Sequence, residues 1–275
     1  MMNKQSIELS IRGVRYYLEM SGKGTPLWLL HGFTGSTKTW GNIIPLLCEH
    51  RKVISIDLIG HGKTESPQNV DRYKMEEQVK DLEEIRKALD LHSLDLLGYS
   101  MGGRVALSFA MTYRKHVQKL ILESSSPGLE KEEERIARKQ SDNNLSERIK
   151  RDGLERFVDY WQDIPLFQSQ KSLPKEVQQN IRSERLQQNP IGLANSLVGM
   201  GTGSQPSWWQ ELKKLDIPTL LITGTLDHKF VKIAQEMLKV LPHAEQIDVF
   251  GVGHAIHVEE PEKFVKIVRE FLLST

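Results

Sequence analysis

Cysteine is almost absent from this sequence, and neither sign of charge dominates it. The 275 residues include one cysteine, which excludes a disulfide within the chain and a zinc site built from cysteines. Lysine and arginine number 37 against 36 acidic residues, so the formal net charge is +1. Nucleic-acid-binding proteins have a basic excess that this chain lacks. We therefore expect no nucleic-acid partner.

Long hydrophobic runs are also missing. No stretch approaches the run of about 18 apolar residues that a membrane span needs, and the segment MMNKQSIELSIRG lacks the apolar core of a secretory signal. We expect no membrane association and a cytoplasmic location, which the single cysteine also fits. Apolar residues make up 39% of the chain and charged residues 27%, values typical of a globular enzyme.

Eight short apolar segments, rich in β-branched residues, alternate with helical patterns along the chain. The six later segments are continuous apolar runs, as in strands buried on both faces of a parallel sheet. The first two can pair as a hairpin through Gly13. This alternation predicts an α/β fold with a mostly parallel eight-stranded sheet flanked by helices. The predicted strands are 6–13, 14–20, 26–32, 52–58, 94–100, 118–124, 218–224 and 245–251.

One part of the chain interrupts the alternation. Residues 127–206 contain no convincing strand pattern and are helical and charge-rich in character. Ligands of open α/β sheets bind outside the carboxyl ends of the strands, so we expect this insertion to cover that edge. The predicted domains are a core of residues 1–126 and 207–275 and a helical lid of residues 127–206.

A Gly-x-Ser-x-Gly pentapeptide, residues 98–102, lies between a predicted strand and a predicted helix. A sharp strand-to-helix turn at this motif raises the serine above the edge of the sheet. The serine then lies at a helix N-terminus, whose dipole favours developing negative charge. We predict Ser100 as the catalytic serine.

A catalytic serine needs a base, and the base needs an acid to orient it. In this type of fold the chain order is serine, acid, histidine. Asp227 and His254 follow predicted strands in that order, at the same sheet edge as Ser100. Glu123 as the acid and His257 as the base remain alternatives, because Glu123 also ends a strand and His257 is three residues from His254.

The predicted oxyanion hole consists of two backbone N–H groups, from Met101 after the serine and from Phe33 in the glycine-rich loop 31–35. The sequence has no nucleotide-binding loop and no metal-ligand cluster. We therefore expect no cofactor and no metal.

Five motifs in this order resemble those of the α/β-hydrolase superfamily: LHGFTGS, DLIGHGKTESP, GYSMGGRVAL, LITGTLDHKF and GVGHAIHVEEP. They extend over nearly the whole chain. A narrower resemblance is carried by the arginine directly after the double glycine, together with ESSSPGL, EEERIARKQSD, YWQDIPLF and IRSERLQQN. These features look like the 2-succinyl-6-hydroxy-2,4-cyclohexadiene-1-carboxylate synthase family of menaquinone biosynthesis.

The narrower resemblance implies a carbon–oxygen lyase that eliminates pyruvate from an enolpyruvyl-cyclohexene tricarboxylate, with Ser100 as general base. The partner would be a small substrate with several carboxylates. Arginine suits such a ligand because its planar fork binds a carboxylate through two hydrogen bonds. The role of the three serines at 124–126 stays open. The substrate-binding residues that the resemblance implies are Tyr99, Arg104, Arg138, Gln140, Trp161 and Arg185.

Two other functions remain in view. An ester or C–C bond hydrolase would use the same three residues, with Ser100 as an acyl nucleophile, but would not need the arginines. A non-catalytic small-molecule receptor could keep the fold and its pocket. The intact set of serine, aspartate and histidine disfavours the receptor.

Overall fold

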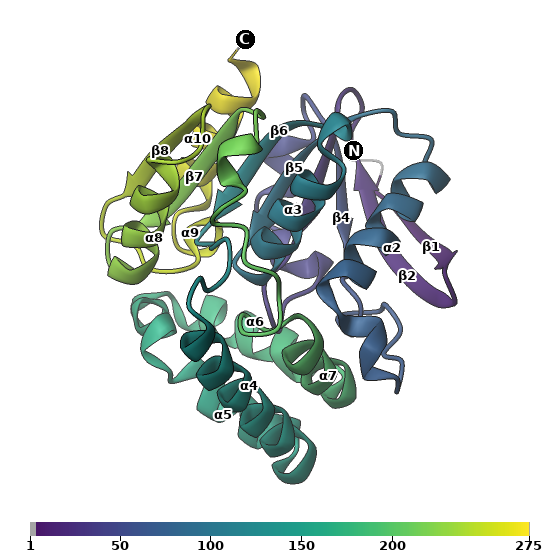
Figure 1. The fold of residues 1–275 in the computed structure, drawn as a ribbon, viewed down its shortest axis with the longest axis vertical. Helices are drawn as coiled ribbons and strands as arrows, with labels where there is room; N and C mark the ends of the chain where they lie inside the picture. Colours follow the sequence, from purple (N-terminus) through teal and green to yellow (C-terminus); the bar gives the residue numbers. More distant parts are fainter. Residues whose placement is uncertain (1–3, 275) are drawn as a thin grey trace.

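A twisted eight-stranded sheet forms the centre of the computed structural model, which describes residues 4–274 (Figure 1). The strand order is β1-β2-β4-β3-β5-β6-β7-β8. Strand β2 runs antiparallel to β1 and β4, and all other neighbours are parallel, as predicted. The strands are β1 (Gln5–Ile11), β2 (Val14–Ser21), β3 (Pro26–Leu30), β4 (Lys52–Ile56), β5 (Leu94–Tyr99), β6 (Val117–Glu123), β7 (Thr219–Gly224) and β8 (Ala244–Val249).

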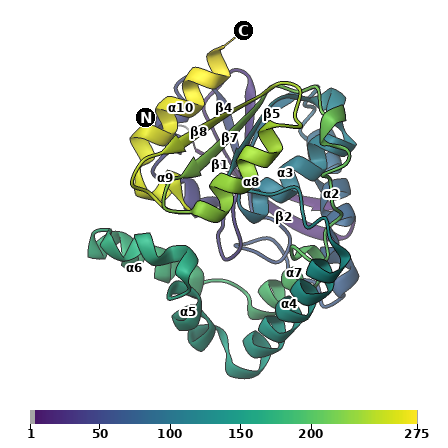
Figure 2. The same ribbon diagram turned by 60° about the vertical axis from the view of Figure 1, so that its left-hand side comes forward.

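Helices cover both faces of this sheet, which explains the continuous apolar runs. Every residue of β5 and β7 is buried, whereas most residues of the edge strands β1 and β8 are exposed or partly exposed. Helices α2, α3 and α8 lie on one face, and α10 lies on the other (Figure 2). One large apolar cluster fills each side. The helices that flank the sheet are α1 (Ile44–Leu47), α2 (Met75–Ala88), α3 (Met101–Thr112), α8 (His228–Leu238), α9 (Ile256–Glu259) and α10 (Pro261–Leu273), with 3₁₀ turns η1 (Thr37–Trp40), η2 (Val70–Tyr73), η3 (Arg114–His116) and η5 (Leu212–Lys214).

The segment between β6 and β7 is helical and forms a layer beyond the carboxyl ends of the strands (Figure 2). Its helices share a small apolar cluster of their own, which includes Ile149, Phe157 and Leu193. We propose that residues 127–206, which include these helices, form a lid over the sheet edge. Within residues 4–274, no helix has both the length and the apolar composition to cross a bilayer. The helices of this layer are α4 (Glu132–Asp152), α5 (Leu154–Gln162), η4 (Pro165–Ser172), α6 (Lys175–Leu186) and α7 (Pro190–Met200).

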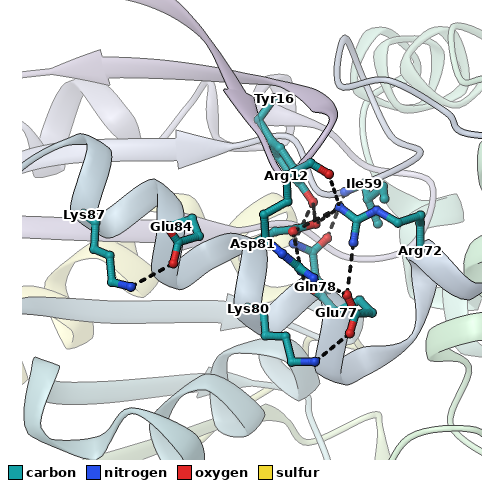
Figure 3. Close-up of polar contacts among 10 residues, drawn as sticks. All are labelled: Arg12, Tyr16, Ile59, Arg72, Glu77, Gln78, Lys80, Asp81, Glu84 and Lys87. Atoms are coloured by element: carbon teal, nitrogen blue, oxygen red, sulfur yellow. Dashed lines mark hydrogen bonds and ion pairs between the residues drawn. The ribbon is translucent and has the colours of Figure 1, made fainter.

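A buried carboxylate fastens the β1–β2 hairpin to α2 (Figure 3). Asp81 of α2 is fully buried and accepts hydrogen bonds from Arg12 Nη1 (2.8 Å), Arg72 Nη2 (2.9 Å) and the Tyr16 hydroxyl (2.7 Å). Burial raises the pKa of Tyr16, and the neighbouring Asp81 charge adds to that effect. The network compensates the buried charge with two cations and fixes the hairpin at the edge of the sheet.

Candidate active site

The predicted elbow joins β5 to α3 at Ser100. Its backbone has φ +50° and ψ −107°, in the positive-φ range that a non-glycine residue rarely adopts. Glycine is required on both sides, because a Cβ on Gly102 would lie 2.0 Å from the carbonyl oxygen of Leu30 and one on Gly98 would lie 2.4 Å from that of Gly102. The tight turn therefore presents the Ser100 side chain at the carboxyl edge of the sheet, at the start of a helix.

A chain of hydrogen bonds links the serine to an aspartate through one imidazole. Ser100 Oγ lies 2.9 Å from His254 Nε2, and His254 Nδ1 lies 2.6 Å from Asp227 Oδ2. His254 and Asp227 are both buried. Asp227 is also the N-cap of α8, where its other carboxylate oxygen accepts from the amide of Phe230. With Nδ1 donating to Asp227, Nε2 is free to accept the seryl proton.

The two alternative residues pair with each other instead. His257 Nδ1 lies 2.8 Å from both carboxylate oxygens of Glu123, and the His257 amide donates to Glu123 Oε1 (3.0 Å). The ring of Tyr99 contacts both imidazoles, with centroid distances of 5.3 Å to His254 and 4.7 Å to His257. Neither Glu123 nor His257 bonds to the Ser100 side chain, so Asp227 and His254 are the pair at the serine.

Two backbone amides near Ser100 are available to an oxyanion. Met101 is the first residue of α3, and the Phe33 amide makes no hydrogen bond within residues 4–274. Both residues line the same cavity as Ser100. The nearby serines differ in role: Ser126 lines this cavity, whereas the Ser125 hydroxyl donates to the Ser100 carbonyl oxygen (3.2 Å).

The cavity above Ser100 has a volume of about 910 Å³ and lies between the sheet edge and the helical layer. Its walls are largely aromatic near the serine, with Phe33 and Tyr99 from the core and Trp161 and Phe167 from the helices. The indole N–H of Trp161 is buried without an acceptor among the described residues.

Two arginines add positive charge to the same cavity. Arg104 Nη1 donates to the Met200 carbonyl (2.6 Å) and to the side-chain oxygen of Gln205. Burial lowers the pKa of Arg104 to about 9, and the nearby charge of Arg138 contributes to the shift. Arg138 Nε donates to Asp142 (2.8 Å). The site therefore holds two cations close together, which favours an anionic ligand.

Two of the residues implied by the resemblance do not line this cavity. Gln140 is on the exposed face of α4 and donates to Asn144, so its predicted polar contact in this cavity is absent. Arg185 is buried and lies over the ring of Phe167 (4.6 Å), beside a separate cavity of about 390 Å³ that shares Tyr99 and Phe167 as a wall. Burial lowers the pKa of Arg185 to about 10.

The sequence reasoning missed the residues that hold the arginines. Asp142 and Gln205 are both buried and bond to Arg138 and Arg104 respectively. A four-residue spacing on α4 is the signal that could have indicated the contact between Arg138 and Asp142. Nothing in the sequence points to the contact with Gln205, because its 101-residue separation from Arg104 is closed only by the fold. Across the described part of the chain, no group of three or more His, Cys, Asp or Glu side chains is arranged to hold a metal ion.

The family model described as "alpha/beta hydrolase fold" matches residues 25–261. The chain belongs to the α/β hydrolase family. This α/β hydrolase is 50% identical to a Bacillus subtilis (strain 168) protein whose name marks it as a candidate 2-succinyl-6-hydroxy-2,4-cyclohexadiene-1-carboxylate synthase. The match covers 95% of this chain and 96% of the B. subtilis protein.

A second relative and a solved structure agree with that similarity. The synthase of the same name from Klebsiella pneumoniae is 30% identical over 90% of this α/β hydrolase and 94% of the relative. The structure of MenH from S. aureus superimposes with a TM-score of 0.89 at 37% identity and covers 94% of this chain and 97% of that one. The esterase from Thermogutta terrifontis, solved with malate bound, gives a TM-score of 0.87 at 28% identity, with 98% of each chain covered.

Proposed function

We propose that this α/β-hydrolase-fold enzyme is a 2-succinyl-6-hydroxy-2,4-cyclohexadiene-1-carboxylate synthase, which eliminates pyruvate from an enolpyruvyl-cyclohexene tricarboxylate. One observation carries the proposal. Ser100, which is hydrogen-bonded to His254, lines the same cavity as two arginines that can bind carboxylates. The similarity to the B. subtilis and K. pneumoniae proteins supports the same substrate. A hydrolase of apolar esters has no use for two cations beside its serine.

In the proposed reaction Ser100 acts as a base rather than as a nucleophile. His254 Nε2 takes the seryl proton, while Asp227 stabilises the imidazolium through its contact with Nδ1. The seryl oxygen then removes a proton from a ring carbon of the substrate. The electrons of that C–H bond pass into the ring system, and the negative charge is stabilised by the amides of Phe33 and Met101.

The second half of the reaction breaks the carbon–oxygen bond to the enolpyruvyl group. The ring electrons form the new double bond as the enolate of pyruvate leaves. His254 returns its proton to the departing enolate, so Ser100 ends as a hydroxyl and no net proton is gained or lost. No acyl-enzyme is formed at any stage.

Substrate orientation in this proposal depends on the cationic and aromatic side chains of the cavity. Arg104 lies one helical turn after Ser100, since its amide donates to the Ser100 carbonyl (3.1 Å). Arg104 and Arg138 would bind carboxylates, and Trp161 would form an aromatic wall of the cavity. Tyr99 would form the apolar floor of the site. Arg185, beside the neighbouring cavity, contributes positive charge across the shared wall.

The direct test is to supply the purified protein with the enolpyruvyl precursor and to follow pyruvate with a coupled lactate dehydrogenase assay. We expect pyruvate release by the wild type, and a loss of at least about 10³-fold in the Ser100→Ala variant. Ser141→Ala, an exposed serine on α4, is the matched control and should retain full activity. An absence of pyruvate release by the folded wild type would refute the lyase assignment.

A serine hydrolase with Ser100 as acyl nucleophile is the second candidate, because the same three residues serve that chemistry and the T. terrifontis esterase shares the fold. Aryl esters offered beside the enolpyruvyl precursor separate the two activities. Predominant turnover of the aryl esters, with a burst that reports an acyl-enzyme, would favour the hydrolase.

A further inference from the structure

The two arginines of the cavity are held by different kinds of partner. Among residues 4–274, the Arg104 side chain donates only to neutral oxygens, those of the Met200 carbonyl and the Gln205 amide. No carboxylate of these residues forms an ion pair with Arg104, and the charge of Arg138 repels it. Neutral acceptors orient Arg104 but leave the repulsion between the two guanidinium groups in place.

Asp142 is the carboxylate that offsets this repulsion. It is 4% exposed, accepts from Arg138 Nε and attracts Arg104 through space. Asp142 itself does not line the cavity. Besides Arg104 and Arg138, the charged residues that line it comprise three of each sign: Glu130, Glu134 and Glu236 against Lys131, Lys229 and Lys232. Because the charges of those six residues cancel, the net charge that a ligand meets in the cavity depends on Arg104, Arg138 and the neighbouring Asp142.

The geometry of the contact also determines which part of Arg138 faces the ligand. Asp142 Oδ1 accepts the hydrogen bond from Nε of Arg138. The two terminal nitrogens of Arg138 have no hydrogen-bond partner in the described part of the chain. The Arg138 side chain is 39% exposed and is one of the side chains that line the cavity. The terminal pair is one of the faces of a guanidinium that binds a carboxylate through two bonds.

The second oxygen of Asp142 is packed against the backbone at Gly201. Asp142 Oδ2 is buried without a hydrogen-bond partner among residues 4–274, and it lies against Gly201, where a Cβ would be 2.5 Å from it. A buried carboxylate oxygen without a partner destabilises the fold. Its presence beside the ligand cavity calls for a role other than stability.

We propose that Asp142 is a positioning residue for substrate recognition. It turns the terminal nitrogens of Arg138 toward the cavity, and it keeps small inorganic anions from occupying the arginine pair. A substrate with several carboxylates overcomes this effect because it engages both arginines at once. The inference rests on the proposed function, since it assigns Asp142 to the selection of a polycarboxylate by that same site.

Two variants separate the two parts of this role. Asp142→Asn removes the charge but retains an oxygen that accepts from Arg138 Nε, so we expect inorganic sulfate to bind about tenfold more tightly than to the wild type. Asp142→Ala also removes the acceptor. Relative to the Asn variant, it should raise the KM for the enolpyruvyl precursor about tenfold and leave kcat within about threefold, because Arg138 is no longer oriented.

Glu147→Gln is the matched control, since Glu147 lies on the same helix in an exposed ion pair with Lys150. It should alter neither sulfate binding nor KM. Sulfate binding is measured by isothermal titration, which needs no turnover and stays informative if the wild type releases no pyruvate. Unchanged sulfate affinity in the Asn variant, or equal KM in the Asn and Ala variants, would overturn the proposal.

Discussion

Two carboxylate–imidazole pairs lie side by side beneath the cavity, and their separate replacement tests which of them serves the reaction. Asp227 pairs with His254, which touches Ser100, and Glu123 pairs with His257, which does not. The perturbation is the same in both cases, a carboxylate changed to its amide: Asp227→Asn and Glu123→Gln. We expect opposite effects on activity and stability.

Asp227→Asn should abolish turnover with little loss of stability. The amide NH₂ of asparagine donates to Nδ1 and so forces the imidazole proton onto Nε2, which then cannot accept from Ser100. The same tautomer change in a serine protease lowers kcat by about 10⁴-fold, and we expect a similar loss here. Asparagine still caps α8, so the free energy of unfolding should change by no more than about 1 kcal/mol.

Glu123→Gln should lower stability with little loss of turnover. Glu123 is fully buried and accepts from both the amide and the ring of His257, at 2.8 to 3.0 Å. Loss of these charge-assisted contacts in a buried place lowers the free energy of unfolding by about 2–4 kcal/mol. Activity of the folded fraction should stay within about tenfold of the wild type.

The assay combines pyruvate release with urea unfolding of each variant at a temperature where both are folded. The two readouts are needed because a loss of activity by unfolding would resemble a loss of chemistry. The reasoning fails if a folded Glu123→Gln protein loses as much activity as Asp227→Asn, or if Asp227→Asn retains more than about a tenth of the wild-type rate.

Three further perturbations test other parts of the structure. Arg104→Lys should raise the KM for the precursor about tenfold or more, because an ammonium group lacks the planar fork, and steady-state kinetics with unchanged KM would contradict the proposed carboxylate contact. Asp81→Asn should lower the free energy of unfolding by about 2 kcal/mol, since two partly exposed arginines lose a buried counterion; an unchanged urea midpoint would contradict this. Acidification from pH 7 to pH 4.5 should destabilise the fold, because burial lowers the pKa of His31 to about 3 and of His61 to about 4, below the usual 6.5. The unfolded chain then binds more protons below pH 6.5, and His61→Asn should flatten the pH dependence of the urea midpoint.

Local chemistry explains how much of the fold could be predicted. Each predicted strand overlaps an observed one, because continuous apolar runs bounded by glycine, proline or charge have few other ways to be buried. The apolar stripe of residues 75–90 and that of residues 261–275 likewise predict helices, and α2 and α10 begin at the first residue of these segments and end at Ala88 and Leu273. Residue 275 lies outside the described residues. The elbow at Ser100 was predictable for the same reason, since the required glycines are immediate neighbours in the chain.

Helix geometry explains why Gln140 does not line the same cavity as Arg138. Residues two apart on an α-helix point to different faces, so Arg138 and Gln140 cannot both face one cavity, whereas Arg138 and Asp142, four apart, share a face. This periodicity was readable from the sequence. The orientation of Arg185 was not, because the side chain faces a different cavity only through the way α6 packs against Phe167.

The sequence by itself determined the sheet, the strand-to-helix turn and the order of the serine, aspartate and histidine along the chain, because these depend on neighbours a few residues away. Only the tertiary structure decided which carboxylate meets which imidazole. Glu123 ends β6 and Asp227 follows β7 at the same edge of the sheet, and His254 and His257 are three residues apart, so the choice depends on side-chain packing around Tyr99. Long-range packing likewise brought Gln205 to Arg104, because that contact joins residues 101 positions apart and no local pattern encodes it.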